Sequence, residues 1–310
     1  MKFWIAMAVL TAAAIGLALS PVNEYFFYAA YVVLTYVVLA TAWNILGGYA
    51  GYVNFGTPAF FGIGAYAAVV LMRWLHAPLA LQIAAAALMG GLLGFGVGML
   101  TLRLRGIFFA IATVAVIFIM ETLMINWRYV GGATGLQLIR PDVMAPFASY
   151  TRMLFVVMAL MAIAAVAIAR YIQDSWIGRG LRAVRDSEEA AEANGVPTLR
   201  LKLLACTVMG ALMAAAGAPM PMYLSFIEPA STFNLSYTVG ALGSAIIGGM
   251  SHWLGPIVGA LLLGSLQQII TVTISGEVNV LVVGVLLVLF VVLAPQGLLG
   301  LFKRWLPFSR

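Results

Sequence analysis

Long apolar runs broken by short polar turns make up most of the 310-residue chain. The longest of them, residues 25–72, holds no Asp, Glu, Lys or Arg. About 20 apolar residues suffice to cross a hydrocarbon core about 30 Å thick, so this run is too long for one crossing. A glycine cluster divides it, formed by Gly47, Gly48, Gly51 and Gly56. The pattern predicts ten membrane-spanning helices, near residues 3–20, 25–46, 58–73, 79–102, 106–125, 151–172, 201–224, 237–250, 256–273 and 278–296.

The composition also indicates that most of the chain lies in lipid. Hydrophobic residues make up 64% of the chain and charged residues only 8%, whereas soluble proteins carry roughly 25% charged residues to face water. A soluble globule is therefore excluded. We predict an all-α polytopic membrane protein of about ten helices, with residues 1–310 forming a single transmembrane domain.

The basic residues predict an orientation. In membrane proteins Lys and Arg concentrate in cytoplasmic loops, and ten alternating spans bring the larger basic clusters of this chain to one side. We therefore expect these clusters and both termini to be cytoplasmic. The clusters are Lys2; Arg103 and Arg105; Arg170, Arg179, Arg182, Arg185, Arg200 and Lys202; and Lys303, Arg304 and Arg310.

Ten spans are compatible with two halves of five, the second inverted relative to the first, as in many transporters. Placing Asn54 over Asn234 aligns the third span with the eighth, but little else in the two segments matches. The residues alone leave the 5+5 inverted repeat open.

The only long polar stretch, residues 174–200, reads as a compact cytoplasmic element. Asp186 can cap a helix whose Glu189 completes a capping box, while Gly195 supplies a left-handed exit and Pro197 prevents continuation. This pattern predicts a short helix with both ends specified.

Two interpretations of this stretch stay open. Arg179, Arg182 and Arg185 recur every three residues, which gives a basic face that could contact anionic lipid. Alternatively the segment is a docking surface, in which the small residues Ala190 and Ala191 allow a close approach by another protein.

Several motifs resemble one family. Glu189-Ala190-Ala191, followed after three residues by Gly195, resembles the EAA motif of the membrane subunits of bacterial ABC importers. Other stretches are similar to branched-chain amino acid permeases of the LivM type. They are residues 178–185, 203–205, 51–56, 60–66, 132–136, 254–256, 259–260 and 295–301.

This resemblance implies a permease subunit in a bacterial cytoplasmic (inner) membrane. It would pair with a second, homologous permease, two cytoplasmic ABC ATPases and a periplasmic solute-binding protein. ATP and Mg would be bound by the ATPases, and consistently this chain has no Gly-x-x-x-x-Gly-Lys-Ser/Thr loop. We expect no enzymatic activity, cofactor or metal in the chain itself. Segment 174–200 would couple it to an ATPase, through Glu188, Glu189, Ala190, Ala191, Gly195, Arg182 and Arg185.

Two short spans suggest where a solute passes. Residues 58–72 and 237–250 would reach only about 22 and 21 Å, so each helix should begin inside the membrane, with a re-entrant or interrupted segment before it. Thr57 can cap the first of these helices, with Pro58 at its first position. The candidate pathway residues are Asn54, Phe55, Gly56, Thr57, Asn234 and Ser236. Close helix packing would explain the same glycines without any ligand.

The expected solutes, by resemblance, are branched-chain or other small apolar amino acids. A permease for urea, short amides or another small solute fits the same residues, and so does a self-sufficient secondary transporter. Against the last stands the lack of paired intramembrane ionisable residues for ion coupling.

Overall fold

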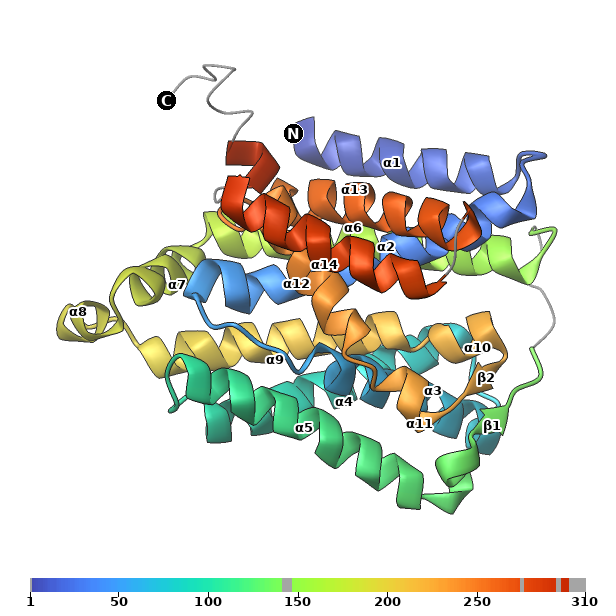
Figure 1. The fold of residues 1–310 in the computed structure, drawn as a ribbon, viewed down its shortest axis with the longest axis horizontal. Coiled ribbons are helices and arrows are strands. Elements are labelled where there is room, and N and C mark those ends of the chain that lie inside the picture. The colour runs from blue at the N-terminus through green and yellow to red at the C-terminus, as the bar shows by residue number, and fades with distance from the viewer. Residues whose placement is uncertain (1, 141–146, 274–275, 294–296, 301–310) are drawn as a thin grey trace.

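The computed structural model describes residues 2–140, 147–273, 276–293 and 297–300, and it is a bundle of long, roughly aligned helices (Figure 1). Each predicted span corresponds to a helix within these residues, so the all-α polytopic prediction is confirmed. The ten helices are α1 (Lys2–Ala18), α2 (Glu24–Ala50), α3 (Thr57–Leu75), α4 (Leu79–Thr101), α5 (Ile107–Asn126), α6 (Tyr150–Asp174), α9 (Thr198–Gly217), α12 (Ser236–Gly248), α13 (Leu254–Thr273) and α14 (Gly276–Leu293).

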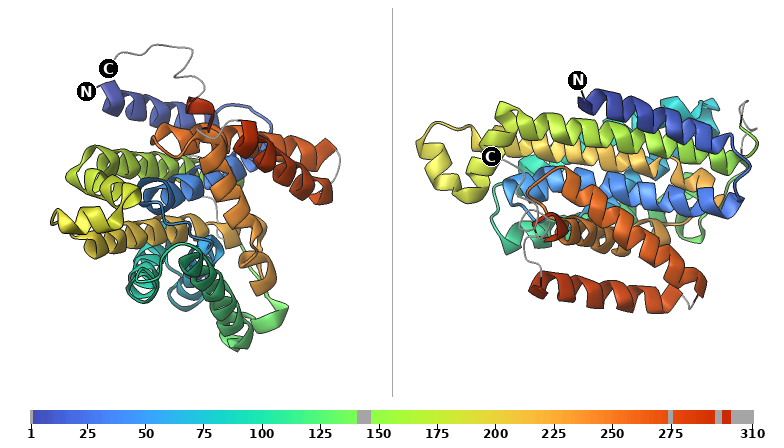
Figure 2. Two further views of the ribbon diagram at one scale, coloured as in Figure 1. Left: turned by 60° about the vertical axis from the view of Figure 1, so that its left-hand side comes forward. Right: turned by 90° about the horizontal axis from the view of Figure 1, so that it is seen from above.

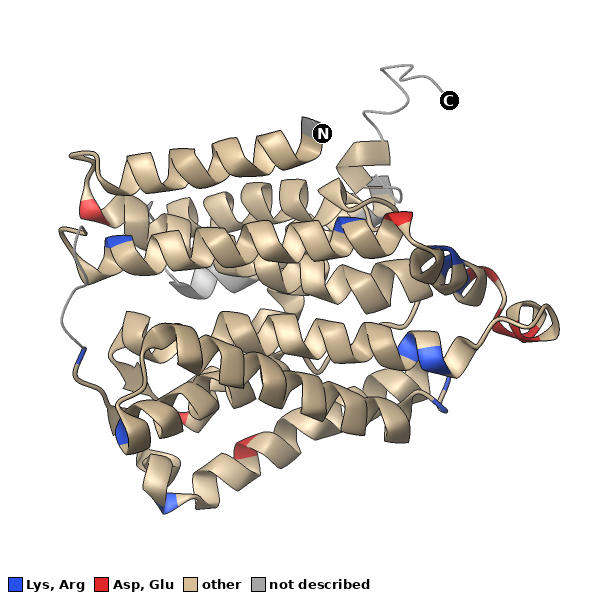
Figure 3. Cartoon of the chain, turned by 180° about the vertical axis from the view of Figure 1, so that it is seen from behind, with Lys and Arg blue, Asp and Glu red and all other residues tan. Residues whose placement is uncertain are grey.

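Seven stretches are long and apolar enough to cross a membrane, in α2, α3, α4, α5, α6, α13 and the run Thr198–Leu224, while α1 and α14 hold shorter apolar stretches. Charged residues gather at the two ends of the bundle and leave its middle almost uncharged (Figure 3). The chain is a multi-pass membrane protein.

The structure corrects some predicted boundaries. The second helix does not stop at residue 46 but includes Gly47 and Gly48 and ends at Ala50. The predicted span 201–224 is two helices, α9 and α10 (Met220–Leu224), because the chain breaks around Pro219. The end of the last predicted span, residues 294–296, and the basic residues after 300 lie outside the described residues, as does part of the 295–301 motif.

Short elements cover both ends of the bundle. One end carries α7 (Trp176–Asp186) and α8 (Glu188–Ala193), which project beyond the long helices (Figures 1 and 2). We call this the α8 end; α1 begins and α14 ends toward it. The opposite end carries η1 (Arg128–Val130), η2 (Gly132–Thr134), α10, α11 (Pro229–Thr232) and two short strands, β1 (Leu136–Gln137) and β2 (Phe226–Ile227), which pair antiparallel.

Helix packing supports the repeat that the sequence left open. Most of the main helix–helix contacts occur twice when the two halves are matched helix by helix. The pairs are α1 with α6, α2 with α9, α3 with α12, α4 with α13 and α5 with α14. The α4–α9 contact corresponds to α13–α2, α3–α9 to α12–α2, and α3–α4 to α12–α13, while α2–α9 maps onto itself. The extensive α2–α6 contact has no comparable counterpart between α9 and α1 among the described residues, so the two halves are similar but not identical.

Glycines permit the closest of these contacts. A Cβ atom on Gly90 of α4 would overlap the backbone oxygen of Gly210 in α9, and a Cβ on Gly259 of α13 would overlap the backbone oxygen of Ser244 in α12. Small residues at helix interfaces allow such an approach in lipid. Packing therefore accounts for glycines such as Gly90 and Gly259, whereas the glycines of residues 51–56 are not helical.

Candidate functional site

Helix α8 is a short element with both ends specified. The Ser187 side chain accepts a hydrogen bond from the backbone N–H of Ala190 (3.3 Å), and Gly195 adopts a left-handed conformation (φ +79°) just after the helix. The predicted cap, Asp186, is instead the last residue of α7, because the chain becomes extended at Ser187. The capping box predicted with Glu189 is therefore absent from this helix start.

The predicted coupling residues divide between two faces of α8. The side chain of Glu189 is 82% exposed, and Ala190 and Gly195 are exposed as well. Ala191 is buried in the hydrophobic core, and the side chain of Glu188 is only 14% exposed. The outer face can meet another protein, and the inner face holds the helix to its own chain.

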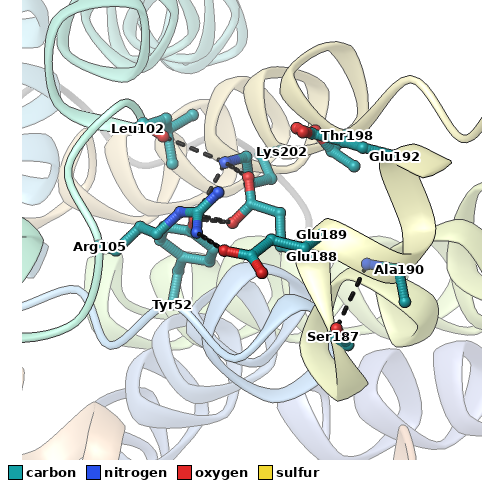
Figure 4. Close-up of polar contacts among 10 residues, drawn as sticks. All are labelled: Tyr52, Leu102, Arg105, Ser187, Glu188, Glu189, Ala190, Glu192, Thr198 and Lys202. Carbon is teal, nitrogen blue, oxygen red and sulfur yellow. Dashed lines mark hydrogen bonds and ion pairs between the residues drawn. The ribbon is translucent and has the colours of Figure 1, made fainter.

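The inner face meets a buried polar cluster (Figure 4). The ammonium of Lys202, in α9, donates to the Glu188 carboxylate, to the Tyr52 hydroxyl (2.9 Å) and to the backbone oxygen of Leu102 (3.1 Å). The Tyr52 hydroxyl donates to the other Glu188 oxygen (2.6 Å). Arg105 lies at the rim, 3.7 Å from Glu188 and also paired with Glu189 (3.0 Å).

The charges in this cluster complement one another. Burial by itself raises the pKa of the Glu188 carboxyl, but hydrogen bonds from Lys202 and Tyr52 and the positive charges of Lys202 and Arg105 outweigh it, so the pKa lies below its ordinary value. Glu188 is therefore ionised at neutral pH, and Lys202, which is 2% exposed, has this partly buried carboxylate as its counter-charge. Sequence reasoning counted Lys202 only among the basic residues of a loop. Lys202 lies in a largely apolar run, residues 201–210, where a charged side chain needs a partner of opposite charge or a backbone carbonyl. This position was the available signal for the ion pair.

The two predicted coupling arginines lie on α7. The guanidinium of Arg185 donates to the backbone oxygen of Gly48 (3.1 Å), near the end of α2, and pairs with Asp186 (3.6 Å). Arg182 is partly buried on the same helix. Arg185 therefore also has a role within the chain, because it holds α7 against the point where α2 ends.

After α2 the chain turns back into the bundle as residues 51–56, which have no regular secondary structure. Gly51 ends α2 in a left-handed conformation (φ +77°). The segment then runs from the α8 end toward the middle of the bundle, where α3 begins (Figure 1). This is the predicted interrupted helix, in which Tyr52, Asn54 and Gly56 are buried inside protein while Gly51 and Val53 are exposed.

Asn54 anchors this segment at depth. Its side-chain oxygen accepts from the Gly56 N–H (2.6 Å), its amide donates to the sulfur of Met209 (3.5 Å), and its backbone oxygen accepts from the Trp43 ring N–H (2.7 Å). Asn54 is 1% exposed. The side chain that the sequence singled out as a pathway residue is therefore engaged within the protein.

Phe55 and its neighbours join the two halves of the bundle. The Phe55 N–H donates to the Thr113 hydroxyl of α5 (3.1 Å), and its backbone oxygen accepts from the Thr238 hydroxyl of α12 (2.6 Å). Gly56, not Thr57, is the cap residue of α3, and the buried Thr57 hydroxyl has no hydrogen-bond partner among the described residues. The capping role predicted for Thr57 is therefore wrong.

The two halves of the predicted pathway meet only in part. Asn234 and Ser236 are exposed, and the Asn234 side-chain oxygen accepts from the N–H (2.9 Å) and hydroxyl (2.6 Å) of Ser236. The meeting point lies further along α12, where Thr238 reaches Phe55. Sequence reasoning missed Thr238 and Thr113; Thr238 lies in the second short span, two residues past Ser236, which was the available signal.

Among the residues that the structure describes, no group of three His, Cys, Asp or Glu side chains is arranged to hold a metal ion. The arrangement is one of packed helices, a polar cluster at one end and an irregular segment leading inward.

Comparison with known proteins gives matches along most of the chain. The permease protein LivM of the high-affinity branched-chain amino acid transport system of Salmonella typhimurium is 29% identical over 301 residues, covering 87% of this chain and 69% of LivM. LivH of Escherichia coli is 29% identical over 153 residues, 49% of each chain. The ribose import permease protein RbsC of Haemophilus influenzae is 30% identical over 139 residues, 43% of this chain and 42% of RbsC. No solved structure gives a significant match.

The family comparison agrees with the motifs. Residues 25–291 match the family described as branched-chain amino acid transport system / permease component. This span includes α2 to α13 and most of α14, together with the α8 cluster and residues 51–56. The resemblance to LivM-type permeases is confirmed, and the chain belongs to the family of permease components of branched-chain amino acid transport systems.

Proposed function

We propose that this chain is one permease subunit of an ATP-driven importer and that α8 is the helix on which an ATPase docks. The observation that carries the proposal is the division of α8 into two faces. Glu189 and Ala190 are exposed on an element that projects beyond the bundle, while Glu188 and Ala191 fix that element to the transmembrane helices. A helix fixed in this way can transmit a push, which a mobile loop could not.

The proposed assembly contains this chain, a second homologous permease, two cytoplasmic ABC ATPases that bind ATP and Mg, and a periplasmic solute-binding protein. The α8 end then faces the cytoplasm, in agreement with the basic residues of α7 and with the positive-inside rule. Because α1 begins and α14 ends toward this side, the proposal has both termini cytoplasmic. The proposed membrane is the bacterial inner membrane, as expected for a permease of this family. ATP hydrolysis belongs to the ATPase subunits.

The proposed solutes are branched-chain or other small apolar amino acids. Support comes from the names of LivM and LivH and from the apolar residues beside the interrupted segment, where Phe61 packs against Tyr237 with ring centroids 4.5 Å apart. The solute path follows residues 51–57 and the start of α12, with Thr57 supplying a buried hydroxyl that is not used in the fold. RbsC, named for ribose import, makes another small solute the alternative to test.

One substitution tests the docking role. Ala190→Lys places a long charged side chain on the outer face of α8, and Ala133→Lys makes the same change at an exposed position of η2, at the opposite end of the bundle. With the chain expressed beside its genomic neighbours, we expect Ala190→Lys to lose the ATPase subunits on affinity purification and Ala133→Lys to retain them. Equal recovery of ATPase with both variants would contradict the proposal.

Solute identity is tested by uptake into proteoliposomes that hold the complete complex. We expect ATP-dependent accumulation of leucine, competed by isoleucine and valine. Competition by urea, short amides or ribose instead would assign another solute, and leucine uptake without ATPase subunits would indicate a secondary transporter.

A further inference from the structure

The docking helix and the interrupted segment, which are 136 residues apart in the sequence, share one polar cluster. Glu188 on the inner face of α8 accepts a hydrogen bond from the hydroxyl of Tyr52, the second residue of segment 51–56. Lys202 donates to both of them. Figure 4 shows these side chains converging between α8, α9 and the chain that follows α2.

The cluster gives α8 a direct connection to this segment. As a six-residue helix, α8 packs mainly on its neighbours in sequence, α7 and α9. Within the cluster, the contact of α8 with segment 51–56 is made by side chains, through the Tyr52 hydroxyl.

Beyond Tyr52 the connection continues to the start of α3. Two residues after Tyr52, the Asn54 side chain accepts a hydrogen bond from the Gly56 N–H. The Phe55 backbone is hydrogen-bonded to Thr113 of α5 and to Thr238 of α12. Each of these contacts is fully or partly buried. Only Val53 separates Tyr52 from Asn54, so a displacement of Tyr52 acts on Asn54 through two residues of chain that span at most about 7 Å.

We propose that Tyr52 is a positioning residue that transmits movement of α8 to segment 51–56 through its bond to Glu188, so that ATPase docking and the solute path move together. This inference rests on the proposed importer function and names the contact through which that function is coupled. The other reading is that the cluster only stabilises the fold. The two readings differ in what happens when the Tyr52 hydroxyl alone is removed.

Tyr52→Phe removes that hydroxyl and leaves the ring, the Glu188–Lys202 ion pair and the Lys202–Leu102 bond in place. Tyr49→Phe is the matched control. It removes a hydroxyl three residues earlier that also makes buried contacts, to the backbone oxygen of Ala169 (3.3 Å) and the side chain of Gln173 (3.2 Å), both in α6. Neither control contact reaches α8.

The test is the number of solute molecules imported per ATP hydrolysed, measured in proteoliposomes with the complete complex. We expect both variants to retain the ATPase subunits and to hydrolyse ATP, and only Tyr52→Phe to lose coupling. The expected loss is at least about tenfold, the low end of the roughly 10- to 150-fold range that corresponds to one hydrogen bond to a charged group. Equal coupling in the two variants would overturn the inference, as would loss of the ATPase subunits from Tyr52→Phe.

A distance measurement provides a second test that does not depend on transport. Val53 and Ala193 are both exposed, so each can be changed to Cys and spin-labelled after the buried Cys206 is replaced by Ala. We expect the distance between the labels to stay constant between nucleotide-free and ATP-bound complexes, and to change with nucleotide only when Tyr52→Phe is added. A distance that changes with nucleotide in the parent protein would overturn the inference. Absence of ATP-driven uptake by the unmodified complex would instead overturn the proposed function.

Discussion

Replacing Lys202 with Met is the most informative perturbation of the buried cluster. Lys202 is 2% exposed, and its ammonium contacts the Glu188 carboxylate, the Tyr52 hydroxyl and the Leu102 backbone oxygen. Met has a similar length and no charge, so it fills the space while leaving Glu188 without its nearest counter-charge. The variant therefore tests electrostatics more than packing.

The magnitude follows from how much of Glu188 remains compensated. Removing one partner of a buried ion pair costs about 3–5 kcal/mol. Glu188 keeps the hydrogen bond from Tyr52, has Arg105 at 3.7 Å and retains 14% side-chain exposure. We therefore expect the low end of this range, about 3 kcal/mol, or a fall of roughly 6 °C in the unfolding midpoint for a chain of this size.

Thermal unfolding in detergent, followed by the fluorescence of the seven Trp residues, measures this loss. Adding Glu188→Gln to Lys202→Met removes the uncompensated charge and should recover at least about half of the loss. Arg200→Met, at an exposed position two residues away, is the control and should change stability by no more than about 0.5 kcal/mol. A Lys202→Met variant as stable as Arg200→Met, or one that Glu188→Gln does not rescue, would refute the reasoning.

Three further predictions follow from single contacts. Thr57→Val should leave stability within about 0.5 kcal/mol of the unmodified chain, because the Thr57 hydroxyl has no hydrogen-bond partner among the described residues, but it should lower solute uptake. Thr113→Val leaves the Phe55 N–H without its acceptor and should cost about 1–3 kcal/mol of stability. Unchanged uptake by Thr57→Val would remove Thr57 from the pathway. Gly64→Ala should prevent folding or assembly, since the new Cβ would overlap the α9 backbone. Gly91→Ala should be tolerated, because its Cβ would lie 3.6 Å from the nearest atom. Equal yields of the two variants would contradict this packing. The pKa of Glu188 is lowered in the folded state, so the ionised carboxylate stabilises the fold fully at pH values above the ordinary pKa of 4.5. This stabilisation is lost as the pH falls from 4.5 through the folded-state pKa. An acid-induced loss of stability as large in Glu188→Gln as in the unmodified chain would contradict this prediction.

The helices were predictable from sequence because each depends on a local property. A charge-free run that faces lipid satisfies its backbone polar groups within itself by forming a helix, and irregular backbone such as residues 51–56 needs protein around it. The predicted end of α2 is wrong because it treats Gly47 and Gly48 as a helix break. In membrane helices glycine also allows close packing. A Cβ on Gly48 would overlap the Asn44 side chain.

The site was predictable only where a residue acts through its own segment. The interrupted segment around Asn54 and the short helix α8 were predictable as structural elements, because caps, small residues and short spans are local signals. The Tyr52, Glu188 and Lys202 cluster joins three segments across 150 residues of sequence, so no local spacing contains it. The same holds for Thr113 and Thr238, each of which meets Phe55 from a different helix.

The central claim, that this chain is the permease subunit of an ATP-driven importer, is tested most directly by its composition after purification. The tagged chain, expressed with its genomic neighbours, would be extracted in mild detergent, its co-purifying proteins identified by mass spectrometry, and the preparation reconstituted for uptake. We predict recovery of a second permease and two ATPase subunits, with solute uptake that requires ATP. Recovery of this chain alone, still catalysing uptake in vesicles without ATP, would contradict the account and make the protein a secondary transporter.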